Sequence, residues 1–313
     1  MESIATFDHH DDVTLPYRST DAIGIAKAIS MPQEVIDSLV RIRAAHPLEM
    51  GDESGANGRT IQRLPAGLTE PATRHRSWRE LKTRLGDDPD GFTMLCCMLE
   101  AAGRYSLPRY RALHIPDAIF VDTMGAFSRF VGESLARHHR YCFDRDFWTI
   151  RQLSLTLFRL GSLEFEFVQD PEHSPSDASG PIIDMHIPSD ADLRDEAVNS
   201  SLQQWNAFTG QHFPQWHDIA KHCTSWMLSP ALDQLLPESS HILAFQRRFR
   251  QIGFDADAPD WREWVFDADP APIAQLPERT SLQRSMKRFI LQGGKIGVAS
   301  GILMNEHVDR DML

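Results

Sequence analysis

The period of the hydrophobic pattern changes near Phe147, and this change constrains the fold more than any other feature of the chain. Before it, segments such as 120–135 carry apolar residues at intervals of three and four, which predicts amphipathic helices. After it, the segment SLEFEFV alternates apolar and acidic residues, which is typical of a half-buried strand. The sequence therefore predicts an α+β protein, with a mostly helical domain at residues 1–145 and a mixed α/β domain at residues 146–313.

The expected elements follow from the same patterns. Helical spacing predicts helices near 31–46, 73–85 and 91–102, and a longer one that begins after the segment HIPD. In the second part, strands are expected at SLEFEFV, IIDMHI, CTSWML and KIGVASGILM, with helices between them. Strands that alternate with helices favour an α/β or α+β arrangement for this part.

Charge and composition exclude several functional classes. The chain of 313 residues has a net charge of -12 and a pI of about 5.6, which repels nucleic-acid phosphate and anionic lipid. No apolar run approaches the roughly 20 residues that cross a bilayer, and the N-terminus lacks the pattern of a signal peptide. We therefore expect a cytoplasmic protein that binds neither nucleic acid nor membrane.

The four cysteines indicate neither a disulfide framework nor a metal site. They include one adjacent pair and no C-x-x-C spacing, so no zinc knuckle is expected. Walker A, G-x-G-x-x-G, H-E-x-x-H and G-x-S-x-G patterns are also missing. The sequence predicts no bound metal.

The segment IIDMHIPSDADL places a histidine where a strand gives way to a helix. Pro188 ends the strand ladder, Ser189 can cap the helix, and Asp192 completes a capping box. None of this requires His186. Its imidazole could accept a proton at the carboxyl end of a strand, or it could simply be hydrogen-bonded at a sheet edge, and the sequence leaves both interpretations open.

A second junction, in CTSWMLSPALDQLL, has the same order of residues. The strand is expected to end at Leu228, with Ser229 as the cap and Pro230 in the first helical turn. Backbone N–H groups at such a turn suit a phosphate. Cys223 and Ser225 would share one side of the strand, where they could line a site or pack in the core.

Two basic clusters stand out in the acidic chain, QRRFR and ERTSLQRSMKR. Charges spaced along helices are most often solvated, but these could also hold the phosphates of a cofactor.

Four segments carry a family resemblance: FRLGSLEFEF, HIPSDADLRDEAVNSSLQQW, HCTSWMLSPALDQLLPESSHILAFQRRF and LPERTSLQRSMKRFILQGGKIGVASGIL. Together they resemble bacterial acyltransferase-domain proteins, in which a helical N-terminal domain precedes a GNAT-like C-terminal domain. The resemblance implies binding of acetyl-CoA or a longer acyl-CoA, and transfer of the acyl group to an amine of a small-molecule or peptide acceptor. In that superfamily the coenzyme pyrophosphate binds backbone amides at a strand-to-helix turn. The residues implied for the coenzyme are Leu228, Ser229, Ala231, Arg247, Arg248 and Arg284.

The resemblance also implies catalytic roles. Direct transfer needs a base for the ammonium nucleophile and an acid for the departing thiolate. His186, Glu164 or Glu166 suit the first role, and Ser225 or Cys223 the second.

Two alternatives remain at this point. The turn WMLSPAL lacks the glycines of the superfamily's phosphate-binding pattern, which favours a non-catalytic GNAT-like module that binds a small molecule or a protein partner. Acyl transfer through Cys223 with His186 is the other alternative, and it requires two distant strands to adjoin. The sequence does not define the acceptor, the acyl length or the oligomeric state.

Overall fold

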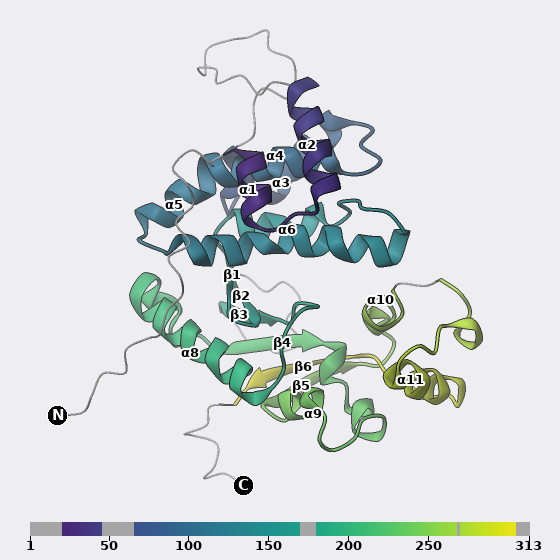
Figure 1. The fold of residues 1–313 in the computed structure, drawn as a ribbon. Helices are drawn as coiled ribbons and strands as arrows, with labels where there is room; N and C mark the ends of the chain where they lie inside the picture. Colours follow the sequence, from purple (N-terminus) through teal and green to yellow (C-terminus); the bar gives the residue numbers. More distant parts are fainter. Residues whose placement is uncertain (1–20, 46–65, 170–179, 268–269, 305–313) are drawn as a thin grey trace, which may run out of the picture. The chain divides into compact units, whose positions relative to one another are not determined.

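The computed structural model describes residues 21–45, 66–169, 180–267 and 270–304. It divides into two compact units, Met1–Leu155 and Thr156–Leu313. Each unit is described by itself below (Figure 1).

The first unit is built from helices. Its longest helix, α6, runs from Asp117 to His138 and buries an apolar face that includes Phe120 and Phe127. Nearly every residue of α4 is buried, including Cys96 and Cys97. Burial raises the pKa of these thiols to about 11 and about 12. They are therefore core residues. The elements are α1 (Ala22–Ala28), α2 (Gln33–Ala45), η1 (Ala66–Thr69), α3 (Arg74–Leu85), α4 (Phe92–Ala101), the π-helical turn η2 (Ala102–Ser106), α5 (Leu107–Ala112), α6 (Asp117–His138) and α7 (Asp146–Leu153).

The boundary between the units lies after Leu155, whereas the sequence placed it at residue 145. The difference is α7, whose residues Ile150 and Leu153 are buried. Its side chains contact those of the first unit, as when Trp78 and Lys82 bind Asp146. The apolar face of an amphipathic helix shows that the helix packs on a core. At a domain boundary, the sequence of the helix does not show which of the two cores it covers.

The second unit is built around a six-stranded sheet (Figure 1), which confirms the mixed α/β domain that the sequence predicted. The strand order is β1-β2-β3-β4-β6-β5, and every neighbouring pair is antiparallel except β3 and β4. The strands are β1 (Leu157–Leu160), β2 (Leu163–Val168), β3 (Ile182–His186), β4 (Lys221–Ser225), β5 (Phe249–Asp255) and β6 (Val298–Leu303). The helices are α8 (Asp195–His212), η3 (Pro214–Trp216), η4 (Trp226–Leu228), η5 (Pro230–Gln234), α9 (His241–Gln246), α10 (Asp260–Phe266), η6 (Ile273–Gln275) and α11 (Ser281–Leu291).

Helix α8 connects the two parallel strands and packs on one face of the sheet. Trp205 of α8 is fully buried and stacks on Phe165 of β2, with ring centroids 4.9 Å apart. Phe208 packs on Phe158 of β1 in a tilted arrangement, with ring centroids 4.7 Å apart. Since side chains alternate along a strand, the acidic residues of SLEFEFV belong to the other face.

At two junctions the helices do not begin where the sequence predicted. Strand β3 ends at His186 as predicted, but α8 begins at Asp195, and the expected cap at Ser189 with Asp192 is not formed. Instead the Asp192 carboxylate accepts hydrogen bonds from the backbone N–H and side chain of Arg194. Such a local turn competes with helix capping.

At the second junction β4 ends at Ser225, three residues before the predicted Leu228. Two short 3₁₀ helices, η4 and η5, follow in place of the predicted helix. Ser225 caps η4 by accepting a hydrogen bond from the N–H of Met227 at 3.1 Å, so the serine ends the strand early.

In the part of the chain that the structure describes, no helix has the length and apolar character needed to span a bilayer. The cytoplasmic location stays a prediction.

Candidate active site

Four ionisable side chains of β2 and β3 gather on the face of the sheet opposite α8. The antiparallel register pairs Glu164 with His186, and Glu166 with Asp184. His186 Nε2 lies 3.0 Å from a carboxylate oxygen of Glu166 and 3.9 Å from one of Asp184. Glu164 and Glu166 are almost fully buried. The structure thus brings His186, Glu164 and Glu166, the three predicted base candidates, into one cluster.

This cluster determines the charge of the histidine. Burial alone lowers the pKa of His186, but Asp184, Glu166 and Glu164 raise the pKa by more. The net result lies above the ordinary value of 6.5. The ring is therefore protonated over a wider pH range than a free imidazole, and it can accept a proton only above its raised pKa.

The sheet opens beside His186. Strands β3 and β4 pair only where Ile183 meets Lys221 and Asp184 meets His222. Both strands then continue, β3 to His186 and β4 to Ser225. Because the strands are parallel, their carboxyl ends lie at the same edge of the sheet, which is where ligands of open α/β sheets bind.

Three residues on this face were not singled out from the sequence. His222 is the β4 partner of Asp184, and Thr224 lies two residues further along the same strand. The Thr224 hydroxyl lies 2.8 Å from that of Ser300 on β6. Burial lowers the pKa of His222, so the two histidines of the face shift in opposite directions. Strand alternation separates Thr224 from Cys223 in sequence, but only the register shows that Thr224 shares the face of His186.

Cys223 and Ser225 occupy the opposite face of the sheet. They alternate with His222 and Thr224, and they lie on the side where Lys221 sits over the Trp205 ring of α8. Cys223 is buried, and burial raises the pKa of its thiol well above 9.0. The structure therefore does not bring Cys223 together with His186, and it holds the sulfur as a neutral thiol.

The turn predicted for the coenzyme pyrophosphate is largely buried. Ser229 is fully buried, and its hydroxyl donates to the carbonyl of Ile296 at 2.5 Å and accepts from the N–H of Ala231 at 3.3 Å. Leu228 and Ala231 are also buried. The serine cap expected from the sequence is present, and it already uses the N–H of Ala231.

The three predicted phosphate-binding arginines lie in different settings. Arg248 binds the first turn of α8, with 2.6 Å contacts to Asp195 and Asn199. Arg284 donates to the carbonyl of Glu278 at 2.9 Å, just before α11. Arg247, at the end of α9, is exposed.

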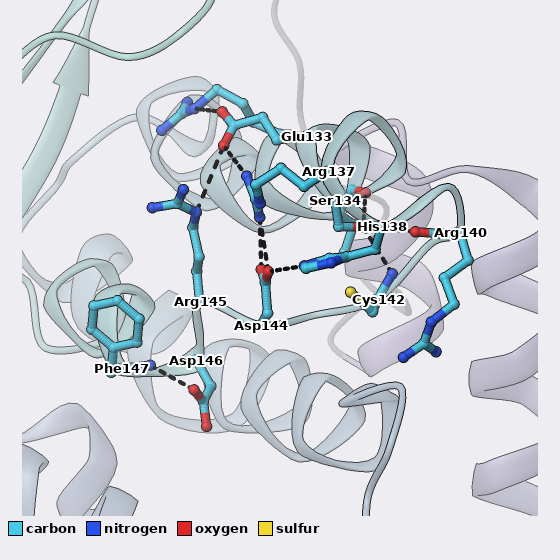
Figure 2. A network of polar contacts seen from close by, with 12 residues as sticks. Glu133, Ser134, Arg137, His138, Arg140, Cys142, Asp144, Arg145, Asp146 and Phe147 are labelled. Carbon is cyan, nitrogen blue, oxygen red and sulfur yellow. Dashed lines mark hydrogen bonds and ion pairs between the residues drawn. The ribbon is translucent and has the colours of Figure 1, made fainter. Parts of the chain in front are cut away.

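Among the described residues of the first unit, one group of side chains has metal-binding chemistry. Ligand atoms of His138, Cys142 and Asp144 lie within 4.8 Å of one another. However, Arg137 donates to both carboxylate oxygens of Asp144 at 2.9 Å, and His138 contacts the same carboxylate at 2.9 Å (Figure 2). Ion pairs account for this approach, so we assign no metal to it.

Comparisons with known proteins agree with this architecture. Residues 20–155 match the N-acyltransferase N-terminal domain, and residues 157–303 match the GNAT-like C-terminal domain. No curated protein matches the chain in sequence.

Solved acyltransferase structures share the fold over 90% of this chain and 99% of theirs. One, in complex with decanoyl-CoA and teicoplanin, is 20% identical with a TM-score of 0.62. A second, in complex with CoA and 10C-teicoplanin, has the same identity and TM-score. A third, in complex with decanoyl-CoA, is 20% identical with a TM-score of 0.58.

The fold and these matches define the class of protein: a GNAT-like domain preceded by a helical acyltransferase domain. The chain combines the N-acyltransferase N-terminal domain with the GNAT-like C-terminal domain, which confirms the two-domain resemblance seen in the sequence.

Proposed function

We propose that the protein is an N-acyltransferase that moves an acyl group from acyl-CoA to an amine of a small-molecule acceptor, with His186 as the general base. The observation that carries this proposal is the cluster of His186 with Glu164 and Glu166 beside the opening between β3 and β4. The two matched domains support acyl transfer. Neighbouring structures that hold decanoyl-CoA and teicoplanin support an acyl thioester donor and a small-molecule acceptor.

The proposed reaction is a direct transfer. His186 takes a proton from the acceptor ammonium, and the neutral nitrogen attacks the thioester carbonyl. The new C–N bond forms as the C–S bond breaks, and the nitrogen releases its second proton as the amide forms. A hydroxyl group donates its own proton to the CoA thiolate and is reprotonated by this second proton. The hydroxyl of Thr224 lies on the face of His186, so we assign this proton transfer to Thr224 rather than to Ser225 or Cys223.

We place the coenzyme pyrophosphate at the start of α8 in preference to the start of η5. The first N–H groups of α8 are not capped by the side chain of Arg194, and Arg248 lies beside them. Helix N-termini attract phosphate through these groups and the helix dipole. Arg248 also balances the charge of Asp195, one of the two acidic residues of this turn, the other being Glu196. At η5, by contrast, the N–H of Ala231 is already bound by Ser229.

Calorimetry with acetyl-CoA, octanoyl-CoA and decanoyl-CoA tests donor binding, and thiol release with a panel of amines tests turnover. We expect binding of at least one acyl-CoA and release of CoA that depends on the amine. Binding without release for any amine would favour the alternative, a non-catalytic GNAT-like module. Binding of no acyl-CoA would refute the proposal.

A further inference from the structure

Glu166 and His186 form a side-chain hydrogen bond whose geometry is defined by two neighbouring strands. Glu166 is the direct cross-strand partner of Asp184. Its side chain therefore reaches diagonally to His186, the next residue of β3 on the same face of the sheet. Its carboxylate lies 3.0 Å from His186 Nε2. The side chains of Glu166 and His186 are 6% and 18% exposed, so little water competes for this contact.

We propose that Glu166 is a positioning residue that fixes the ring orientation and tautomer of His186. This inference rests on the proposed function, in which His186 is the base. A carboxylate accepts hydrogen bonds and, when ionised, cannot donate one. The neutral ring must then carry its proton on Nε2, and its lone pair is on Nδ1. Glu166 thereby selects Nδ1 as the atom that takes the proton of the acceptor.

The other two carboxylates of the cluster are assigned a different part. The Asp184 carboxylate lies 3.9 Å from Nε2, which is too long for a hydrogen bond. Glu164 is the direct cross-strand partner of His186 and acts on the ring through its charge. Asp184 and Glu164 therefore stabilise the imidazolium from a distance, whereas Glu166 also orients the ring.

The two effects have separate consequences for the pH profile. The groups that face His186 are Asp184 on its own strand, Glu164 and Glu166 on β2, and His222 on β4. Loss of either the Asp184 or the Glu166 charge lowers the pKa of His186 and shifts the acidic limb of the profile to lower pH. We expect loss of Glu166 also to lower the plateau, because the Glu166 carboxylate is hydrogen-bonded to the ring and orients it.

The test compares four variants of the full chain: Glu166→Gln, Glu166→Ala, Asp184→Asn and Asp257→Asn. The last is the matched control, since Asp257 is exposed and pairs with Lys295. Profiles of kcat/KM against pH report the limb and the plateau. Long-range ¹H–¹⁵N NMR of the protein without substrate reports the His186 tautomer.

We expect Glu166→Ala to lower the plateau by on the order of 10²-fold, since the carboxylate that orients a catalytic histidine in the Ser-His-Asp triad contributes up to ~10⁴-fold. Glu166→Gln should lower the plateau by roughly 10-fold, because an amide can face the ring with either atom. Both Glu166 variants should shift the acidic limb to lower pH and lose the pure Nε2–H tautomer of His186. Asp184→Asn should also shift the acidic limb, with a smaller effect on the plateau.

An Nδ1–H tautomer in the wild type, or a Glu166→Ala variant with a wild-type plateau, would overturn the inference. Absence of wild-type turnover would instead refute the proposed function. The NMR spectra would then decide by themselves whether Glu166 fixes the ring.

Discussion

The hydroxyl groups of Thr224 and Ser300 lie 2.8 Å apart across β4 and β6. They share the face of the sheet that carries His186, whereas Cys223 and Ser225 face α8. Ser300 is buried and Thr224 is exposed, so the threonine is the member of the pair that a bound ligand could reach. Thr224 can therefore act together with His186, whereas Cys223 and Ser225 cannot.

Thr224→Val removes the hydroxyl while keeping the shape of the side chain. We expect kcat to fall by roughly 10²-fold, the lower end of what a positioned proton donor contributes. Cys223→Ala and Ser225→Ala serve as comparisons and should retain far more of the turnover. Steady-state kinetics at saturating acyl-CoA measures the effect. A larger loss with Cys223→Ala, at an unchanged melting temperature, would contradict the assignment.

His186→Gln should lower turnover by roughly 10²–10⁴-fold and leave acyl-CoA affinity near that of the wild type, because a general base acts in the chemical step. In the wild type, activity should rise with pH through an acidic limb above 6.5. The sign follows from the raised pKa of His186, since only the neutral ring accepts a proton.

His222→Gln tests the other histidine of the face. Since burial lowers the pKa of His222, a profile governed by His222 would have its limb below 6.5. If the His222→Gln variant lost the acidic limb of the pH profile and the His186→Gln variant kept it, the general base would be His222 and not His186.

The sequence predicted the features that depend on local patterns. Alternation in SLEFEFV and the proline after His186 correctly placed β2 and the end of β3, because side-chain period and proline chemistry act over a few residues. The serine cap at Ser229 also formed as expected. The change of hydrophobic period near Phe147 predicted the two-part architecture, and the resemblance supplied the GNAT-like fold of the second part.

The remainder depends on contacts between distant residues. Strand β1 has the short sequence LFRL, and only pairing with β2 identifies it as a strand. The contact of Glu166 with His186 and the position of Thr224 follow from the register, which no single strand encodes. Sequence reasoning placed a helix directly after His186 because it could not weigh the Asp192–Arg194 turn against capping.

Asp144→Asn should destabilise the first unit by about 1 kcal/mol at pH 7, because Arg137 would lose the charge of one of its two carboxylate partners and keep that of Glu133. Urea unfolding measures this. Glu80→Gln is the control, since Glu80 forms an exposed ion pair with Arg76 and should change stability by less than about 0.5 kcal/mol.

The effect of Asp144→Asn should depend on pH. Burial raises the pKa of Asp144, but hydrogen bonds from His138 and Arg137 lower the pKa by more, so the net value lies below 3.8. A depressed carboxyl pKa stabilises the fold above the unfolded value, and this stabilisation is lost as pH falls through the folded value. The difference between variant and wild type should therefore shrink in acid. A constant difference from pH 7 to pH 2 would contradict the ion-pair explanation.

Arg248→Gln should lower the melting temperature, whereas Arg247→Gln should not. Arg248 holds Asp195 and Asn199 of α8, so its loss should lower the melting temperature and weaken acyl-CoA binding. Arg247 is exposed, so its variant should keep the melting temperature. If Arg247 approaches a coenzyme phosphate, the affinity lost in this variant should shrink as salt increases. Equal melting temperatures for both variants would show that the Arg248 contacts add no stability.

Trp205 provides a test of how α8 is held on the sheet. The indole is fully buried and stacks on Phe165, and its Nε1 has no hydrogen-bond partner among the described residues. Trp205→Ala should cost about 3–5 kcal/mol, the usual loss for a large buried aromatic residue. Trp205→Phe should cost much less, because phenylalanine keeps the stacking and removes a buried donor that has no acceptor, which offsets part of the small cavity. Chemical denaturation of both variants measures the two losses. Similar large losses would mean that the indole N–H contributes to stability, whereas two small losses would show that α8 does not depend on this contact.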